Sequence, residues 1–469
     1  MITEPALAVD LDGTLLRSDM LVESFCAGLS EAPVRTIGAI GALWHGRAAL
    51  KRRVAAACTI DPASLPYSDA VLAEIAAARL AGREVWLVSA SDGSLVRAVA
   101  EHLGVFDGVM GSDGVINLRG QAKTDALVAR FGARGFDYIG NESMDLPVWA
   151  QARAVLVAHP EARFLRQVKG RFPEARAIGE PPRPADRLAA LRPHQWLKNL
   201  LVFVPLLAAH SFGWPAILRS VLGFVALSLA ASSLYLVNDL VDLARDRGHH
   251  SKRRRPLASG RLPLQQALIM VPMLLVAALV VSAALPRICL LVLAAYAVAS
   301  LSYSLALKRL LMIDVVMLAC LYGSRLVLGS FAARVPLTAW LAAFSLFLFF
   351  SLAVVKRMAE LAHAPGREAI PGRAYQSGDE AILAALGAAS GMVSVLVFAL
   401  YIDSPAVRAL YRYPSHLWFV CVVLLYWIGR ILLLAHRGEI DADPVIFAAT
   451  DMISVASIVV AGLIVVSAI

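Results

Sequence analysis

The sequence predicts two structural classes in one chain, a soluble α/β domain followed by an all-helical domain embedded in a membrane. Of its 469 residues, 59% are hydrophobic and 17% are charged, which is more apolar than a typical soluble protein. Charged residues are frequent before Trp196, whereas long apolar runs fill the chain after it. The earlier part holds short apolar runs of strand length that end in acidic or hydroxyl residues, as in an α/β sheet.

The first expected strand, Ala6–Val9, leads directly into the sequence Asp-Leu-Asp-Gly-Thr of Asp10–Thr14. A carboxylate at the end of a strand, with a second carboxylate two residues later, suits attack on phosphorus. Asp10 can act as the nucleophile, and Asp12 can protonate the leaving oxygen.

Two later segments add groups of the same kind. The run 84–88 ends at Ser89, whose hydroxyl can hold a phosphate oxygen, and Lys123 can neutralise a phosphoryl charge. A third run ends with the segment 139–145, in which Asn141 and Asp145 offer oxygen ligands suited to Mg²⁺.

This ordered set of motifs resembles the haloacid dehalogenase (HAD) phosphatase superfamily over residues 1–178, most closely the phosphoserine phosphatases. The resemblance implies a HAD-like Rossmannoid fold with a helical cap between the first two motifs, and phosphomonoesterase activity. It implies substrate contacts from Thr14, Ser89 and Lys123, and a Mg²⁺ site formed by Asp10, Asp12, Asn141 and Asp145. The family usually has Asp at the position of Asn141, so this metal site has lost a charge that Asp145 or Glu142 could supply. The alternative is a HAD fold kept only as a structural or binding module.

Residues 179–195 are expected to be a linker and interfacial segment, because Glu180–Pro184 is rich in proline and therefore stiff. Residues 196–469 are expected to form the membrane domain, with about nine transmembrane helices of the length that a bilayer requires. The first run is short and a candidate for a re-entrant segment. The runs lie near 197–213, 216–238, 264–285, 287–306, 311–331, 337–355, 380–401, 415–435 and 445–468.

Basic residues are concentrated in the loops after the second, fourth, sixth and eighth runs, which therefore share one side of the membrane. The segment Met1–Pro5 lacks the features of a signal peptide, so we expect the soluble domain and these loops on the cytoplasmic side of the inner membrane. Loop cations and anionic lipid explain the net charge of +9 without a nucleic-acid partner. Nothing in the sequence indicates an oligomeric state.

The end of the second run carries Asp239, Asp242 and Asp246, and a basic segment, Lys252–Arg255, follows. On a helix these spacings place the three carboxylates on one face, where their mutual repulsion favours binding of a divalent cation. Mg²⁺ commonly shares such oxygens with substrate phosphates, so we expect a metal-diphosphate site. The alternative is a solvated helix end followed by an ordinary positive loop.

The motif Asn-Asp-x-x-Asp-x-x-x-Asp at 238–246 resembles the UbiA superfamily of membrane transferases. Within it, the nearer resemblance is to the decaprenyl-phosphate phosphoribosyltransferases, supported by the segments 192–199, 303–308, 356–360 and 437–444, with Asp314. The resemblance implies a cavity open to lipid, catalytic and Mg²⁺-binding roles for Asp239, Asp242 and Asp246, and substrate contacts from other residues. The expected substrate-binding residues of this domain are Asn238, Lys252, Arg255, Lys198, Lys308, Lys356 and Arg357.

The expected function is a two-step one. The membrane domain would transfer phosphoribose from phosphoribosyl pyrophosphate (PRPP) to polyprenyl phosphate. The HAD domain would then remove the 5-phosphate of the product. The first alternative is an aromatic prenyltransferase, such as a 4-hydroxybenzoate polyprenyltransferase, with a separate or degenerate HAD domain. Against it, no acid follows Asp314 at the spacing of a second acidic cluster, and the later loop offers only Glu360, Glu368, Asp379 and Glu380. The second alternative is a non-enzymatic phosphate-binding module tethered to the membrane.

Overall fold

The computed structural model describes residues 4–39, 41, 44, 50, 52–54, 56, 58–113, 117–249, 252–363, 373–440 and 443–469. The chain forms two compact units. Unit 1 contains residues 1–191 and 235–272, and unit 2 contains residues 192–234 and 273–469. The helices α11 (Trp214–Val241) and α13 (Leu264–Ser282) each begin in one unit and end in the other.

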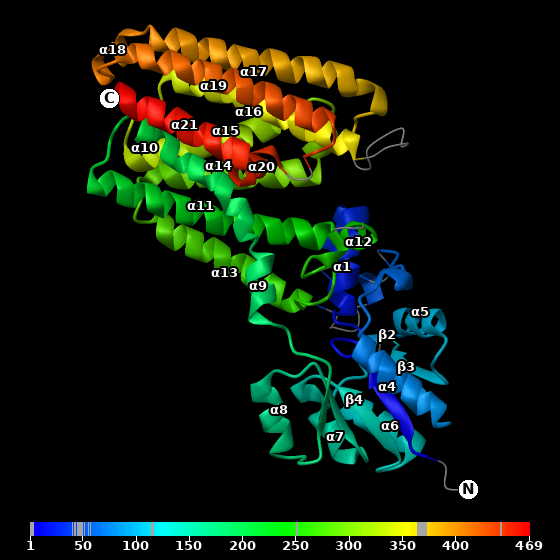
Figure 1. Cartoon of the computed structure of the whole chain (residues 1–469). Helices are drawn as coiled ribbons and strands as arrows, with labels where there is room; N and C mark the ends of the chain where they lie inside the picture. The colour runs from blue at the N-terminus through cyan, green and yellow to red at the C-terminus, as the bar shows by residue number, and fades with distance from the viewer. Residues whose placement is uncertain are drawn as a thin grey trace. The chain divides into compact units, whose positions relative to one another are not determined.

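A six-stranded parallel sheet forms the centre of the soluble part of unit 1 (Figure 1). The strand order is β3-β2-β1-β4-β5-β6, so β1 lies between β2 and β4 and the chain reverses direction across the sheet at β1. In such sheets, ligands bind at the carboxyl ends of the strands beside this reversal. The strands are β1 (Ala6–Asp10), β2 (Val85–Asp92), β3 (Gly108–Ser112), β4 (Phe136–Gly140), β5 (Val155–Ala158) and β6 (Arg176–Ile178).

Helices cover both faces of this sheet because its strands are apolar on both faces. Val71 and Ile75 of α4 pack with the β1 residues Leu7 and Val9 on one face, while Trp149 of α7 packs with Ala8 on the other. The helices of this part are α1 (Met20–Glu31), α2 (Pro33–Ala39), α4 (Asp69–Leu80), α5 (Gly93–Leu103), α6 (Gln121–Phe131), α7 (Leu146–Gln151), α8 (Ala162–Lys169) and α9 (Pro184–Ala190), with short 3₁₀ helices η2 (Pro62–Ser64) and η3 (Ser143–Asp145).

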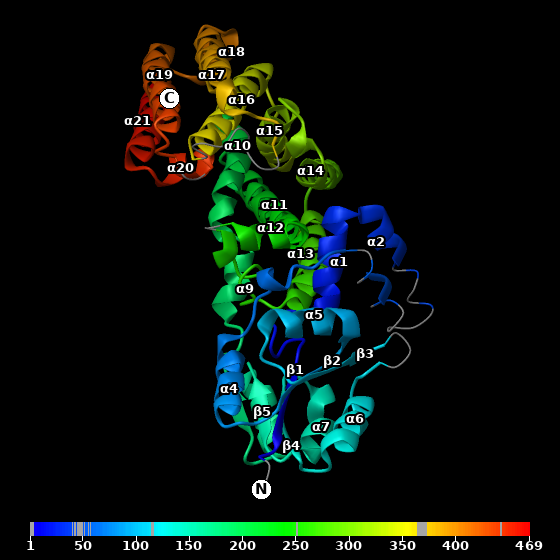
Figure 2. The ribbon, with the colours of Figure 1, turned by 90° about the vertical axis from the view of Figure 1, so that its right-hand side faces the viewer.

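The expected α/β fold with a helical insertion is therefore confirmed, since α1 and α2 lie between β1 and β2 in the chain (Figure 2). Asp19 caps the start of α1 and accepts hydrogen bonds from the backbone N–H groups of Leu21 and Val22. Unit 1 also holds the loop region between α11 and α13, with α12 (Leu243–Gly248) and η5 (Lys252–Arg254).

Unit 2 is all-helical, and its core is built from α15, α16, α17 and α19 (Figure 1). Met358, Leu383 and Ile431 are among the buried residues of this core. The elements of the unit are η4 (Pro193–Phe203), α10 (Val204–Ala208), α14 (Arg287–Leu305), η6 (Leu307–Arg309), α15 (Ile313–Ala333), α16 (Ala339–Ala362), η7 (Ser377–Asp379), α17 (Glu380–Ile402), α18 (Pro405–Leu410), η8 (Pro414–Leu417), α19 (Trp418–His436), α20 (Pro444–Thr450) and α21 (Met452–Ala468).

Among the described residues, seven helices are long and apolar enough to cross a membrane, or eight if α20 and α21 count as one span bent by 79°. The expectation of about nine differs at the first run, near 197–213. That run forms η4 and the five-residue α10, with Pro193 and Pro205 near their starts. A short apolar run can form short packed helices as readily as a span, and composition alone does not separate the two. The last run bends at Asp451, whose side chain caps α21.

Candidate active sites

The predicted phosphatase residues meet at the carboxyl ends of three neighbouring strands. Asp10 is the last residue of β1, Ser89 lies on β2, and Asn141 directly follows β4. Asp10 is in register with Val88 of β2, and the pairing of β1 with β4 brings Ile139 beside the same strand end. Because all three strands are parallel, their functional side chains collect at one edge of the sheet.

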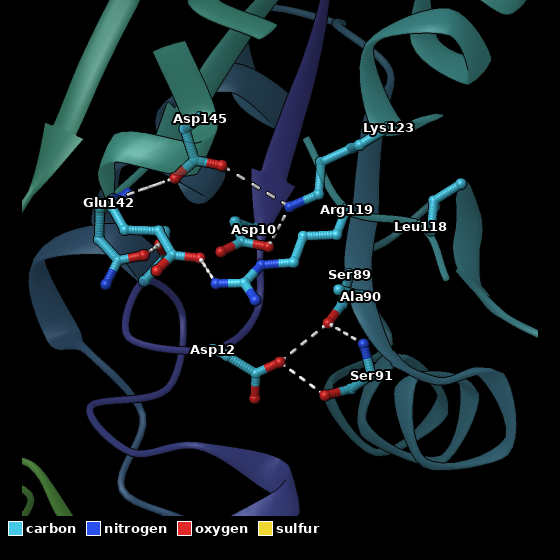
Figure 3. Close-up of polar contacts among 12 residues, drawn as sticks. Asp10, Asp12, Ser89, Ala90, Ser91, Leu118, Arg119, Lys123, Glu142 and Asp145 are labelled. Atoms are coloured by element: carbon cyan, nitrogen blue, oxygen red, sulfur yellow. Dashed lines mark hydrogen bonds and ion pairs between the residues drawn. The ribbon is translucent and has the colours of Figure 1, made fainter. Parts of the chain in front are cut away.

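Lys123 contacts both Asp10 and Asp145 (Figure 3). Its Nζ is 2.7 Å from Asp10 Oδ1, 3.7 Å from Asp145 Oδ1 and 2.9 Å from the Tyr138 hydroxyl. The first turn of α6 carries Lys123, and the ammonium and both carboxylates are almost completely buried. The predicted grouping of Asp10, Lys123 and Asp145 is present in the structure.

Burial raises the pKa of Asp10 to about 7, although the Lys123 ammonium lowers it, and Asp145 and Asp12 raise it further. Three carboxylates thus accompany one lysine, and the negative charge exceeds the positive charge. A buried cluster of carboxylate oxygens with excess negative charge suits a divalent cation.

Asp12 lies beside the two serines at the end of β2 (Figure 3). Its Oδ2 accepts hydrogen bonds from Ser89 Oγ at 3.0 Å and from Ser91 Oγ at 2.6 Å, while Oδ1 accepts one from the backbone N–H of Met20 at 2.7 Å. Ser89, predicted to hold a phosphate oxygen, therefore contacts the predicted acid-base residue. Met20 begins α1, so Asp12 also holds the start of that helix.

Asn141 lies against the Asp-Leu-Asp-Gly-Thr loop. Its Oδ1 accepts a hydrogen bond from Thr14 Oγ1 at 3.3 Å, and a Cβ atom added at Gly13 would lie 2.1 Å from its Nδ2. Gly13 also has a φ of +73°, so a side chain there would be both strained and obstructed.

The oxygens of Asp145, a predicted metal ligand, are engaged by protein donors. Oδ1 accepts from the Tyr138 hydroxyl at 2.9 Å, and Oδ2 accepts from the N–H groups of Asn141 and Glu142 at 3.0 and 3.1 Å. Asp145 therefore holds the turn after β4, and Asp10 and Asn141 are the better placed of the predicted ligands for a metal.

The acidic motif in unit 1 is bound to its own basic segment. Arg255 Nη1 lies 3.1 Å from Asp239 Oδ1 and 2.5 Å from Asp246 Oδ2, and Lys252 Nζ lies 4.0 Å from Asp246 Oδ1. Asp239 and Asp246 are buried although both are acids. The predicted convergence of these two carboxylates with Lys252 and Arg255 is therefore present.

The spacing predicted that the three acids lie on one continuous helix, but the structure has a break between them. Helix α11 ends at Val241 and α12 begins at Leu243, with Asp242 between them. Bonds from Asp242 N to the carbonyl oxygen of Asn238 and from Asp246 N to that of Asp242, both 2.9 Å, keep the helical path across the break. Asp242 pairs with Arg245 at 3.1 Å, three residues further along the chain.

No group of three His, Cys, Asp or Glu side chains in the described ranges forms a metal-binding cluster. Asp239 and Asp246 nevertheless supply buried carboxylate oxygens, and the single charge of Arg255 neutralises only part of their combined charge. Oxygen ligands of this kind match the chemistry of Mg²⁺.

In unit 2, two predicted lysines converge on Asp443. Lys198 Nζ lies 2.8 Å and Lys356 Nζ 2.9 Å from Asp443 Oδ2, and the Tyr322 hydroxyl donates to Oδ1 of the same carboxylate at 2.8 Å. Tyr322 also lies between two cations, because the centre of its ring is 5.9 Å from Lys198 Nζ and 5.7 Å from Cζ of Arg325. This grouping forms a positively charged polar cluster inside the helical unit.

Arg357 is completely buried and is engaged by other protein groups. Its Nε lies 2.7 Å from Asp314 Oδ2, Nη1 pairs with Glu360, and Nη2 donates to the Tyr303 hydroxyl at 2.9 Å. The Tyr375 hydroxyl donates to the other Asp314 oxygen at 2.5 Å. Asp314 and Arg357 thus form a buried ion pair between helices α15 and α16. Arg357 is less accessible to a substrate than Lys356, because its side chain is fully buried.

The remaining predicted contacts lie elsewhere. Lys308 belongs to η6, where its carbonyl accepts a hydrogen bond from Arg373 at 3.2 Å. Asn238 lies near the end of α11. Glu368, noted as a possible acid of the later loop, lies outside the described residues.

Sequence patterns alone did not identify Asp443, Tyr138, Ser91 or Arg325 as site residues. Tyr138 lies on β4 and Ser91 lies on β2, the strands that carry the predicted motifs, so the strand pattern could have identified both. Arg325 is an arginine inside an apolar run, a signal of function or of a buried partner. Asp443 lies in the segment 437–444, and the resemblance of that segment gives no role to this residue.

A UbiA prenyltransferase family model matches residues 199–454, more than half of the chain. The chain belongs to the UbiA prenyltransferase family. With at least seven helices suited to spanning a bilayer, it is an integral, multi-pass membrane protein.

An uncharacterized protein of Sinorhizobium fredii, y4nM, is 36% identical over 96% of this chain and 88% of its own length, so the similarity includes both the soluble and the helical parts. Decaprenyl-phosphate phosphoribosyltransferase of Mycolicibacterium smegmatis is 36% identical over 40% of this chain and 61% of its own length. A phosphoserine phosphatase, solved as a phospho-aspartyl intermediate analogue, covers 35% of this chain and 90% of its own, at 17% identity with a TM-score of 0.26. The HAD-like character of the N-terminal domain rests on its own sheet and motif geometry.

Proposed function

We propose that this UbiA-family protein is a bifunctional enzyme that transfers phosphoribose from PRPP to polyprenyl phosphate and then hydrolyses the 5-phosphate, giving polyprenyl-phosphoryl-ribose. The observation that carries the proposal is the occurrence of two complementary sites in one chain. The helical part is similar to a decaprenyl-phosphate phosphoribosyltransferase, and the soluble part has a phosphomonoesterase-type constellation at Asp10, Asp12 and Lys123. The product of the first reaction has the phosphomonoester that the second site would cleave.

For the transfer, Asp239, Asp242 and Asp246 would hold Mg²⁺, which would neutralise the diphosphate and stabilise the departing pyrophosphate. Arg255 and Lys252 supply N–H groups to the same anion. The bond from C1 to the diphosphate oxygen breaks as a phosphate oxygen of the lipid forms the new bond to C1. The lipid phosphate is already an anion, so no protein base is required.

Cations of unit 2 bind the lipid phosphate in this proposal. Lys198 and Lys356 share the single carboxylate of Asp443, which leaves this group one positive charge in excess. Arg325 adds a buried guanidinium beside Tyr322. Lys308 and Arg357 are secondary candidates.

For the hydrolysis, Asp10 attacks the phosphorus, and the ribose 5-oxygen leaves with a proton from Asp12. Water then attacks the phosphoaspartate and gives its proton back to Asp12, which releases inorganic phosphate. Lys123 binds Asp10 at 2.7 Å and balances the phosphoryl charge. Asp10 and Asn141 would hold Mg²⁺ at this site, with Thr14 and Ser89 beside the phosphate.

We place the protein in the inner membrane with both sites on the cytoplasmic side, because the strongly basic loops then obey the positive-inside rule. The competing function, aromatic prenyl transfer, needs a second acidic cluster for its diphosphate. Asp314 is fully buried and occupied by Arg357 and Tyr375, which argues against that role.

The test uses membranes that contain the full chain. Labelled PRPP with polyprenyl phosphate should give labelled polyprenyl-phosphoryl-ribose, whereas 4-hydroxybenzoate with a prenyl diphosphate should give no product. Asp10→Asn should still consume PRPP but stop at the 5-phosphorylated lipid, which mass spectrometry separates. Identical lipid products from the unchanged protein and Asp10→Asn would refute the two-step function, and prenylation of the aromatic acid would favour the competing one.

A further inference from the structure

A buried ion pair in unit 1 joins the helical insertion of the phosphatase to the acidic motif of the transferase. Arg247 of α12 donates to both oxygens of Glu23 of α1, at 2.9 and 2.5 Å. The Arg247 and Glu23 side chains are only 7% and 6% exposed. Arg247 Nε also donates to the carbonyl of Ala258 at 3.1 Å. Burying two charges costs desolvation energy, so such a pair is weak evidence for stability alone and calls for another explanation.

Further contacts hold the same loop region on the soluble domain. Gln265 donates to Asp19, the capping residue of α1, at 3.1 Å. Gly260 has a φ of +69°, and a Cβ atom added there would lie 2.8 Å from the Cβ of Arg17 and 3.0 Å from that of Pro66. The close fit at Gly260 leaves no space for a side chain, so the loop backbone lies directly on the segments that flank the insertion.

Each partner of the ion pair is directly connected to a proposed catalytic group. Glu23 lies in the first turn of α1, whose first N–H, from Met20, is held by Asp12 at 2.7 Å. Arg247 directly follows Asp246, which binds Arg255 at 2.5 Å. The connection from the proposed acid-base residue to the acidic motif therefore has four links. They are the hydrogen bond from Met20 to Asp12, one turn of α1, the ion pair, and the peptide bond to Asp246.

We propose that Glu23 and Arg247 are positioning residues through which occupancy of the phosphatase site by a phosphate lowers the affinity of the acidic motif for PRPP. The inference rests on the proposed function and adds regulation to it. A phosphate that takes the Ser89 hydroxyl removes one donor from Asp12, and Asp12 holds the start of α1. Any shift of α1 moves Glu23 and, through the ion pair, α12. The enzyme would then delay a second transfer until the first product has been dephosphorylated.

The experiment measures KM for PRPP and kcat of transfer in membranes, with and without inorganic phosphate, and hydrolysis of a small aryl phosphate. In the unchanged protein, phosphate should raise KM for PRPP by about fivefold or more, within the usual range of coupling between sites. Glu23→Gln should raise KM for PRPP by about tenfold without phosphate, leave kcat nearly unchanged and abolish the response to phosphate. Hydrolysis of the aryl phosphate should persist, which shows that the soluble domain is folded.

Two further variants make the result specific. The exchange Glu23→Arg with Arg247→Glu should restore a low KM and the phosphate response, because it reverses the pair without removing it. Glu74→Gln, which removes the Glu74–Arg176 pair between α4 and β6, is the matched control and should change neither quantity.

A phosphate effect that persists unchanged in Glu23→Gln would mean direct competition at the transferase site and would overturn the inference. So would an unchanged KM in that variant. Absence of PRPP transfer by the unchanged protein would instead refute the proposed function, and the inference with it.

Discussion

The proposed phosphatase site and the cationic cluster of unit 2 are assembled in different ways. In the soluble domain, Asp10, Ser89 and Asn141 are brought together by the ends of parallel strands. Their order along the chain is enough to predict that they meet. In the helical unit, Lys198 and Lys356 meet at Asp443 from three separate elements.

The difference shows what local sequence can specify. Strand register repeats along a sheet, so a functional group at one strand end predicts where the next will lie. Helix packing depends on side chains along whole helix surfaces. The position of a polar residue in a connecting segment therefore cannot be predicted from a repeating register. The cluster at Asp443 consequently becomes visible only in three dimensions.

The largest expected effect separates the two sites chemically. Asp242→Ala removes one carboxylate from the acidic motif and should reduce phosphoribosyl transfer on the order of a thousandfold, as losses of electrostatic stabilisation in transition states do. Hydrolysis of a small aryl phosphate should remain, because the Asp10 and Lys123 pair is unchanged. Transfer and hydrolysis are measured in the same membranes. Full transferase activity in Asp242→Ala would refute the assignment of the motif.

The next prediction concerns the shared carboxylate of unit 2. Asp443→Asn leaves two buried lysines without their anion and should lower the free energy of unfolding by about 3 kcal/mol. Asp403→Asn is the matched control, since Asp403 is 80% exposed in its pair with Arg408. It should cost less than about 1 kcal/mol. Thermal aggregation of the detergent-solubilised protein measures both, and equal losses would show that the Asp443 cluster contributes no more than a surface pair.

The sequence predicted the sheet, the helical insertion, the membrane helices after residue 214 and the grouping of Asp10 with Lys123. It did not predict how Asp145 is used. The turn after β4 leaves backbone N–H groups that need acceptors, and Oδ2 of Asp145 accepts from two of them. A motif shows that a carboxylate is present, but its hydrogen-bond partners follow from the local backbone.

The segment 197–213 illustrates a second limit. Its apolar residues match the composition of a span, yet Val202 and Leu206 are buried within the helical unit. Hydrophobicity measures the tendency to leave water and does not distinguish lipid from protein as the new environment. The break at Asp242 could not be predicted from spacing either, because the spacing of the three acids also fits an unbroken helix.

A smaller effect is expected within the soluble domain, away from its site. Asp137 on β4 pairs with Arg83 and with Arg153, the latter at 2.7 Å. Burial raises the pKa of Asp137, but the hydrogen bonds and charges of Arg153 and Arg83 outweigh burial and hold it below its usual 3.8. A pKa lowered by folding adds stability above the unfolded-state pKa, and that stability is lost as the pH falls through the folded-state value.

Asp137→Asn should therefore lower the free energy of unfolding near neutral pH, by about 2 kcal/mol for lost hydrogen bonds to charged groups. The difference from the unchanged protein should shrink as the pH is lowered below 3.8, where the native carboxylate also becomes protonated. Thermal unfolding of the full chain across this pH range provides the measurement. A difference that stays constant would mean that the ion pairs are not its source.

Two arginines inside the helical unit allow the last comparison. Arg325 is 3% exposed, and its Nε donates to Asn199 Oδ1 at 3.1 Å. No carboxylate in the described part of the chain pairs with it. Arg430 of α19 instead forms a bidentate pair with Asp451, at 2.6 and 3.1 Å. A buried guanidinium without a carboxylate is costly, and an anionic substrate would offset that cost.

Arg325→Met should consequently raise KM for polyprenyl phosphate by about tenfold, the loss of roughly 1.4 kcal/mol of binding. KM for PRPP and the hydrolysis of an aryl phosphate should change little, because those substrates bind elsewhere in the proposed scheme. Arg430→Met, which removes an arginine that already has its own anion, should leave KM for the lipid unchanged. Initial rates over a series of lipid concentrations decide the matter. If both substitutions raise KM for the lipid equally, loss of helix packing rather than loss of a phosphate contact explains the effect.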